Sequence, residues 1–181
     1  TKYIEEVAER LQDVGIKALS IHGRTRKQMY KGEADWTLIG KIKENQRIKI
    51  PIFGNGDIDN PEKAKLYKEK YNVDGIMIGR ASIGYPWIFR EIKHFFATGE
   101  KLAGPTLAER ISVCSTHLEK SIEWKGTKTG IFEMRRHYAN YFKGIPDFKE
   151  YRMRLVSLEN VDDISSVLSE IEEKFEDFVA V

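Results

Sequence analysis

The stretch Ile48-Lys49-Ile50-Pro51-Ile52-Phe53-Gly54-Asn55-Gly56-Asp57 decides the fold, because an apolar β-branched run ends here in small and polar residues. A later run over 73–78 ends in Gly79-Arg80, and an earlier one over 17–21 ends in His22-Gly23-Arg24. Short runs rich in Ile and Val predict strands, and glycine beside a polar residue predicts a tight turn. The sequence therefore predicts three strands that each deliver polar residues at their C-terminal end.

Helical patterns separate these three strands. Apolar residues recur at helical spacing over 3–14, and further helices are expected over 36–45 and 60–71. Asn60-Pro61 can cap and begin the last of these helices, and Gly15 supplies a left-handed stop after the first. Alternation of helix and strand with short connections predicts a parallel sheet with right-handed crossovers.

The second half of the chain contains helical signals only. An amphipathic helix over 84–97 ends at Gly99, and Gly104-Pro105 is expected to be a hinge. Thr106 and Glu109 have the spacing of a capping box. Further helices are expected near 106–124, 129–143, 147–157 and 163–179. The fold class is therefore α/β plus all-α, with an α/β domain over 1–102 and a helical bundle over 103–181.

The composition excludes several classes of protein. Hydrophobic residues make up 41% and charged residues 32% of the chain, as in soluble globular proteins. The sequence contains no apolar run long enough for a membrane helix, and its first residues lack the apolar core that a signal peptide would have. One cysteine, Cys114, rules out a disulfide framework and a multi-cysteine metal site. We expect a cytoplasmic protein with no metal and no membrane contact.

The charge distribution is more informative than the net charge of +2. Residues 119–154 contain nine Lys or Arg against five acids, whereas 155–181 contain one Lys against eight acids. A basic block beside an acidic tail predicts one cationic face, suited to nucleic acid, and a solvated acidic face elsewhere.

Two consecutive strand ends, Asn55-Gly56-Asp57 and Gly79-Arg80, predict a phosphate site. Phosphate is bound by backbone N–H groups that glycine leaves accessible, and by guanidinium groups. In (β/α)₈ barrels the recurrent phosphate site uses the loops after strands seven and eight. The alternative is that these glycines only form turns and that Arg80 is a surface residue. His22 could be a buried, hydrogen-bonded residue or a donor to a phosphate or flavin oxygen.

Several motifs resemble the tRNA-dihydrouridine synthases, most closely their bacterial B-type branch. In the first half these motifs are residues 22–26, 32–36, 55–58, 77–81 and 86–89. In the second half, Met134-Arg135-Arg136-His137-Tyr138 and Tyr141-Phe142-Lys143-Gly144 resemble the tRNA-binding helix of the family's C-terminal domain. The resemblance covers essentially the whole chain.

This resemblance implies an FMN-dependent (β/α)₈ TIM barrel with a helical domain, which reduces tRNA uridine to 5,6-dihydrouridine with NADPH as reductant. The implied FMN-binding residues are Asn55, Gly56, Asp57, Gly79, Arg80 and His22. The implied RNA-binding residues are Arg24, Arg26, Arg135, Arg136, His137 and Lys143.

The three strands correspond to the sixth, seventh and eighth of the family's barrel, so the chain resembles its C-terminal part. The family's proton-donating cysteine is expected in the missing N-terminal half, because Cys114 lies in a helical apolar pattern typical of a core residue. We therefore expect this chain alone to be inactive, and its open sheet edge to self-associate. Two alternatives are a non-catalytic RNA-binding module and another phosphate-binding barrel, such as a different flavin oxidoreductase or a sugar-phosphate enzyme.

The aromatic residues predict a mixture of core and contact roles. Trp36, Trp87 and Trp124 are expected to be core or interdomain anchors. Phe142 is expected in the core, while Tyr138 and Tyr141 could offer stacking platforms for bases.

Overall fold

The computed structural model describes residues 3–178, which divide into two compact units. The first unit extends to Ser82 and also contains Ile88–Leu102. The second contains Ile83–Trp87 and the chain from Ala103 onward. The division differs from a single boundary at residue 102 in one respect, because the short segment 83–87 groups with the helical unit.

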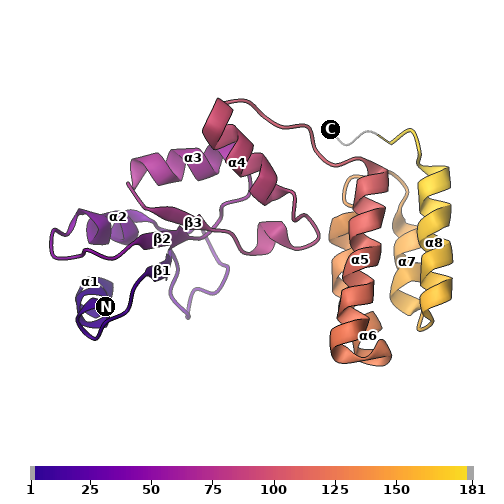
Figure 1. The fold of residues 1–181 in the computed structure, drawn as a ribbon, viewed down its shortest axis with the longest axis horizontal. Coiled ribbons are helices and arrows are strands. Elements are labelled where there is room, and N and C mark those ends of the chain that lie inside the picture. The colour runs from indigo at the N-terminus through magenta and orange to yellow at the C-terminus, as the bar shows by residue number, and fades with distance from the viewer. Residues whose placement is uncertain (1–2, 179–181) are drawn as a thin grey trace. The chain divides into compact units, whose positions relative to one another are not determined.

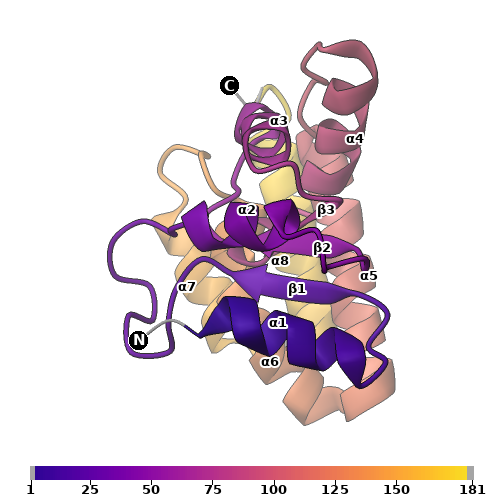
Figure 2. The same ribbon diagram turned by 90° about the vertical axis from the view of Figure 1, so that its left-hand side faces the viewer.

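The first unit alternates helices and strands, as expected (Figure 1). Its elements are α1 (Ile4–Asp13), β1 (Leu19–His22), α2 (Thr37–Glu44), β2 (Ile52–Asn55), α3 (Pro61–Lys70), β3 (Gly75–Met77), the short 3₁₀ helix η1 (Arg80–Ser82) and α4 (Ile88–Thr98). The strands form a three-stranded parallel sheet in the order β1-β2-β3, so the parallel sheet is confirmed (Figure 2). Asn60 accepts a hydrogen bond from the Lys63 amide at 2.8 Å, which confirms its capping role.

The two faces of this sheet differ in burial. One face carries Ile21, Ile52 and Gly54, all buried. Gly54 must be glycine, because a Cβ there would lie 1.9 Å from the buried Trp36 ring. The opposite face carries His22, Phe53 and Met77, which are exposed. One face therefore packs against the unit's own helices, and the other presents polar and apolar side chains.

Several predicted boundaries differ from the structure, among them the end of the last helix, which is expected at 179 and lies at Lys174, and two of the differences have a clear physical cause. The strand expected from residue 48 begins only at Ile52. The Gln12 side chain of α1 accepts hydrogen bonds from the amides of Lys49, at 2.6 Å, and Ile50, at 3.2 Å. These two amides therefore bond to a helix side chain and not to a neighbouring strand. The helix expected from residue 84 begins at Ile88, because Gly84 adopts a left-handed φ of 68° and Pro86 follows in the turn.

The second unit is a bundle of four helices with one continuous core (Figure 1). The helices are α5 (Leu107–Lys125), α6 (Thr127–Tyr141), α7 (Lys149–Ser157) and α8 (Val161–Lys174). Thr106 and Glu109 form the predicted capping box. Gly130 lets α5 and α6 approach closely, since a Cβ there would lie 2.7 Å from the Ile122 nitrogen. Trp87 joins this core from the segment 83–87.

The aromatic predictions for the bundle need two corrections. Trp124 is 82% exposed at the end of α5, so the expectation that it is an anchor was wrong, whereas Trp36 and Trp87 are buried. Tyr138 and Tyr141 are buried together with Phe142, so neither tyrosine can serve as an exposed stacking platform. The acidic residues Asp162, Asp163 and Glu172 on α8 are exposed, as expected for a solvated face. No helix within residues 3–178 meets the length and hydropathy that crossing a bilayer requires.

Candidate functional site

The C-terminal ends of the three strands meet at one edge of the sheet. His22, Asn55 and Met77 are partners in the parallel register. The amide of Gly23 donates to the Asn55 carbonyl oxygen at 2.9 Å, and the Asn55 side-chain amide donates to the Met77 carbonyl oxygen at 2.7 Å. Asn55 therefore ties together all three strand ends, and its side chain is committed to this structural role.

Asp57 is the centre of the polar cluster that follows β2. It adopts a left-handed φ of 57°, which turns its carboxylate back toward the loop after β1. This carboxylate accepts hydrogen bonds from Arg24, at 2.6 and 2.7 Å, from the Ala34 amide at 2.7 Å and from Arg80 at 3.0 Å. The Arg24 hydrogen bonds, with the Ala34 amide and the charges of both arginines, hold the pKa of Asp57 below its ordinary value despite partial burial.

Arg24 lies inside the cluster, with a side chain only 3% exposed. Besides the two bonds to Asp57, its guanidinium donates to the carbonyl oxygens of Lys31, at 3.4 Å, and Gly32. The bidentate pairing raises the pKa of Arg24. This geometry leaves no guanidinium face open to RNA, although the resemblance placed Arg24 on an RNA-facing loop. Arg26, two residues later, is exposed.

Arg80 is the cation of this edge that remains accessible. Its side chain is 53% exposed, contacts Asp57 at 3.0 Å and lies 4.2 Å from the centroid of the Tyr30 ring. Because Arg24 already balances the charge of Asp57, the three groups together leave one surplus positive charge. That surplus is carried by the exposed guanidinium.

Gly56 and Gly79 leave the backbone of this edge open in different ways. Gly56 has a φ of 127°, and a Cβ there would lie 2.6 Å from the Ala34 Cβ and 3.2 Å from the His22 ring. The indole N–H of Trp36 donates to the Gly56 carbonyl oxygen at 3.0 Å and fixes the turn from below. At Gly79 a Cβ would meet nothing within 4 Å, so the backbone there borders open space. His22 is exposed and lies beside the turn at Gly56.

A phosphate group fits these residues. The edge combines a surplus guanidinium at Arg80, open space at Gly79 and the exposed ring of His22. The carboxylate of Asp57, one of the predicted phosphate-binding residues, would repel a phosphate, and its observed partners are Arg24, Arg80 and the Ala34 amide. Within residues 3–178, no cluster of three or more His, Cys, Asp or Glu could hold a metal ion.

The predicted RNA-binding residues of the helical unit divide into bound and free cations. Arg135 donates to the Leu158 carbonyl oxygen at 3.2 Å, and its guanidinium lies 4.3 Å from the Phe132 ring centroid. Arg136 is 69% exposed and contacts Glu133 only at 3.9 Å. Lys143, two residues beyond the end of α6, is exposed. Arg136 and Lys143 are therefore free to meet a phosphate, whereas Arg135 helps to join α6 to the loop before α8.

His137 belongs to a partly buried pair that the sequence did not reveal. Its ring lies 4.8 Å from that of His117 on α5, and His117 Nδ1 lies 3.1 Å from the Tyr141 hydroxyl. Burial, with the nearby Arg136, lowers the pKa of both histidines, so both are neutral near pH 7. The Arg136 Nε donates to His137 Nε2 at 3.2 Å, which orients the exposed guanidinium.

Two contributors to these sites were absent from the sequence-based predictions. Tyr30 supports Arg80, and His117 pairs with His137. Each depends on contacts between segments far apart in the chain or on which side of a helix faces the core. The fold and its sites thus define an α/β unit whose strand-end edge carries an exposed guanidinium at Arg80, covalently joined to a helical unit with exposed cations.

The chain belongs to the dihydrouridine synthase family, whose model matches residues 1–179. It is 42% identical over 167 residues to a probable tRNA-dihydrouridine synthase 1 of Synechocystis sp., covering 92% of this chain and 46% of that protein. It is 45% identical over 154 residues to tRNA-dihydrouridine synthase B of Pseudomonas putida, covering 85% and 45%. The same enzyme of Salmonella typhimurium is 39% identical over 173 residues, covering 96% and 52%. The chain therefore spans about half the length of the curated relatives it matches.

Proposed function

We propose that this chain forms part of an FMN-dependent tRNA-dihydrouridine synthase, in which its three strands belong to a (β/α)₈ TIM barrel. The observation that carries the proposal is the strand-end edge with its surplus guanidinium at Arg80 and open backbone at Gly79. In barrels of this kind the loops after the last strands bind phosphate. Bound FMN would supply the hydride chemistry for reducing a tRNA uridine, with NADPH as the reductant.

The residues of the edge would hold and orient the cofactor phosphate. Arg80 would pair with the phosphate, the backbone around Gly56 and Gly79 would approach it closely, and His22 would donate a hydrogen bond. Asp57 and Arg24 would keep Arg80 in place, because Asp57 binds both guanidinium groups at once. Tyr30 would limit the movement of Arg80 from the other side.

The proton required at the uridine would come from a residue outside these 181 residues. Cys114 is the only cysteine of the chain and is fully buried in the helical unit. Burial raises its pKa to about 12, so it is a core thiol with no access to a substrate. On this proposal the chain alone binds ligands but does not complete the reaction.

The helical unit would bind tRNA through its exposed cations. Arg136 and Lys143 would neutralise phosphates, with His137 orienting Arg136. Exposed Arg26 would contribute from the loop after β1. A tRNA substrate places the protein in the cytoplasm, and the unpaired edges of β1 and β3 would favour self-association of the chain alone.

The test compares FMN with riboflavin, which lacks the phosphate. We expect the chain to bind FMN at least about tenfold more tightly than riboflavin, measured by quenching of flavin fluorescence, since a charge-assisted hydrogen bond to phosphate contributes about 1.5–3 kcal/mol. Arg80→Gln should remove this preference, while the exposed control Arg26→Gln should retain it.

Equal affinity of the wild-type chain for FMN and riboflavin would contradict the phosphate site. Absence of any flavin binding, combined with retained tRNA binding, would instead support the non-catalytic RNA-binding module.

A further inference from the structure

The end of the α5–α6 hairpin exposes two aromatic rings that are each accompanied by cations. Trp124 has the Lys125 ammonium 4.7 Å from its ring centroid. Phe132, which is 38% exposed, has Arg135 at 4.3 Å and Lys128 at 6.0 Å. An exposed indole offers a large apolar face on which a planar ligand can stack.

These residues extend the row of free cations on α6. Lys128, Phe132 and Arg136 follow one another at intervals of four residues, which places them on one side of the helix. All three are exposed, and the row from Lys128 to Arg136 spans roughly 12 Å at the helical rise of 1.5 Å per residue, with Lys143 just beyond the end of α6. Phe132 therefore shares one side of α6 with Lys128 and Arg136, and Trp124 lies four residues before Lys128, at the adjoining end of α5.

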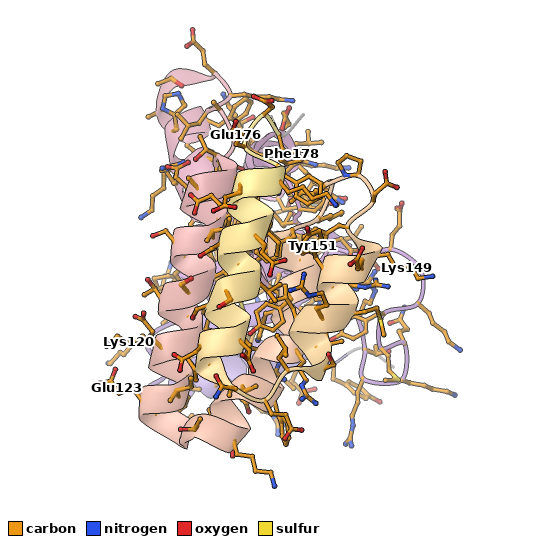
Figure 3. All side chains as sticks on the ribbon, turned by 90° about the vertical axis from the view of Figure 1, so that its right-hand side faces the viewer. Lys120, Glu123, Lys149, Tyr151, Glu176 and Phe178 are labelled. Carbon is orange, nitrogen blue, oxygen red and sulfur yellow. The ribbon has the colours of Figure 1, made fainter. Side chains whose placement is uncertain are left out.

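The charges around the rings favour an anionic partner. Lys120 is paired with Glu123 at 2.6 Å, on the outer side of α5 (Figure 3). Lys125 is paired with Glu133 at 2.5 Å. Within residues 3–178, Lys128 has no carboxylate partner and is exposed. An aromatic ring flanked by an unpaired lysine is suited to a nucleotide, because the base stacks on the ring and its phosphate meets the ammonium.

We propose that Trp124, Lys128 and Phe132 form a stacking surface for an unpaired nucleotide of the tRNA, at the end of the row that leads to Arg136. This inference rests on the proposed tRNA-binding function and adds to it a non-electrostatic contact. A protein partner fits less well, since lysine is depleted in the cores of protein interfaces.

The experiment titrates the full chain with an unmodified tRNA transcript and follows tryptophan fluorescence at several salt concentrations. Trp36 and Trp87 are buried, so quenching by RNA should report mainly on Trp124. Trp124→Ala should weaken binding by about tenfold, within the range for loss of one base–aromatic stack, without changing the dependence of log Kd on log salt. Trp124→Phe should retain most of the affinity.

Charge and position are tested separately. Lys128→Ala should reduce the salt slope by about one, the signature of a lost phosphate contact. Lys149→Ala on α7 (Figure 3) and Phe96→Ala in the first unit are matched controls, because both residues are exposed and neither belongs to the row, and they should leave the affinity unchanged. The melting temperature of Trp124→Ala should equal that of the wild type, because the side chain is exposed.

The possible outcomes distinguish a failure of the stacking surface from a failure of the proposed tRNA-binding function. A wild-type chain that does not bind tRNA overturns both. A wild-type chain that binds tRNA, with an unchanged affinity in Trp124→Ala, overturns the stacking surface alone. If Trp124→Ala abolishes self-association, measured by analytical ultracentrifugation, and leaves RNA binding intact, the surface is a protein contact and the inference is wrong.

Discussion

The two units use arginine in opposite ways. In the first unit Arg24 is almost fully buried, because the left-handed turn at Asp57 aims a carboxylate at its guanidinium. On α6 Arg136 stays exposed, because its nearest carboxylate, Glu133, reaches it only at 3.9 Å. A basic residue in a motif is therefore available to a ligand only to the extent that its pairing with the fold's own carboxylates leaves its side chain exposed.

The two units also differ in how completely they bury their apolar surface. The helical unit has a closed core that includes Tyr138, Met134 and Leu155, all fully buried. The sheet of the first unit leaves Phe53 and Met77 exposed on one face. We expect the helical unit to be the more stable of the two, and the predictions below test this difference from the largest expected effect to the smallest.

Gly54→Val should have the largest effect. The new side chain would collide with the buried ring of Trp36, and overpacking of a core costs typically 1–3 kcal/mol, here about 3 kcal/mol or more. Urea denaturation followed by Trp fluorescence should show early loss of the first unit, while far-UV circular dichroism retains the helical unit. Gly79→Ala is the control and should be neutral, since its Cβ meets nothing within 4 Å. Unfolding of both units at the same urea concentration would contradict the expectation that the helical unit is the more stable of the two.

Asp57→Asn should lower the melting temperature of the first unit by several degrees at neutral pH, since Arg24 would lose its carboxylate. The pKa of Asp57 is lowered in the folded protein. The stability that its charge contributes is therefore complete above its unfolded pKa of about 4 and is lost as the pH falls through the lower folded value. The difference in melting temperature between the variant and the wild type should become smaller below about pH 4. A gap that stays constant into the acid range would show that charge pairing is not the cause.

Arg135→Ala and Arg136→Ala separate the bound from the free cation on α6. Arg135→Ala should cost about 1–2 kcal/mol of the free energy of unfolding, because its bond to the Leu158 carbonyl oxygen is charge-assisted. Arg136→Ala should change that free energy by less than about 0.5 kcal/mol but weaken tRNA binding. Chemical denaturation and tRNA titration of both variants measure the two effects. Equal stability losses would remove the distinction between the two residues.

Tyr138→Phe and Tyr141→Phe give the smallest effects, of opposite sign. The Tyr138 hydroxyl is buried and has no hydrogen-bond partner among residues 3–178, so its removal should stabilise the bundle by about 1 kcal/mol. Removal of the Tyr141 hydroxyl breaks its contact with His117 and should destabilise the bundle by about 1 kcal/mol. Thermal melts of the two variants measure the difference, and a destabilised Tyr138→Phe would reveal a partner for that hydroxyl.

Local patterns in the sequence were enough to predict most of the elements. Glycines after apolar runs marked the strand ends, and Asn60 and the Thr106–Glu109 box marked helix starts, because each acts over three or four residues. The start of β2 could not be predicted, since it depends on the Gln12 side chain some 37 residues away. The family of the chain also followed from its motifs.

The residues of the sites were only partly predictable. Asn55, Gly56, Gly79 and Arg80 meet at one edge because parallel strands bring their ends together. The inward turn of Arg24 and the exposure of Trp124 depend on tertiary packing, which short motifs do not contain. Arg24 and Arg136 both lie in short basic motifs. They differ in burial, because a carboxylate pairs closely with Arg24 and only distantly with Arg136.

Trp87 has a consequence for cleavage of the chain. It packs in the core of the helical unit, yet it precedes α4, which belongs to the first unit. Trypsin cleavage at the exposed Lys101 would therefore yield two fragments, one of which keeps its tryptophan seated in the other. The nicked protein should migrate as one species under native conditions and as two in detergent. Cleavage of the peptide bond after Lys101 would therefore not release the fragments from each other while the helical core remains folded.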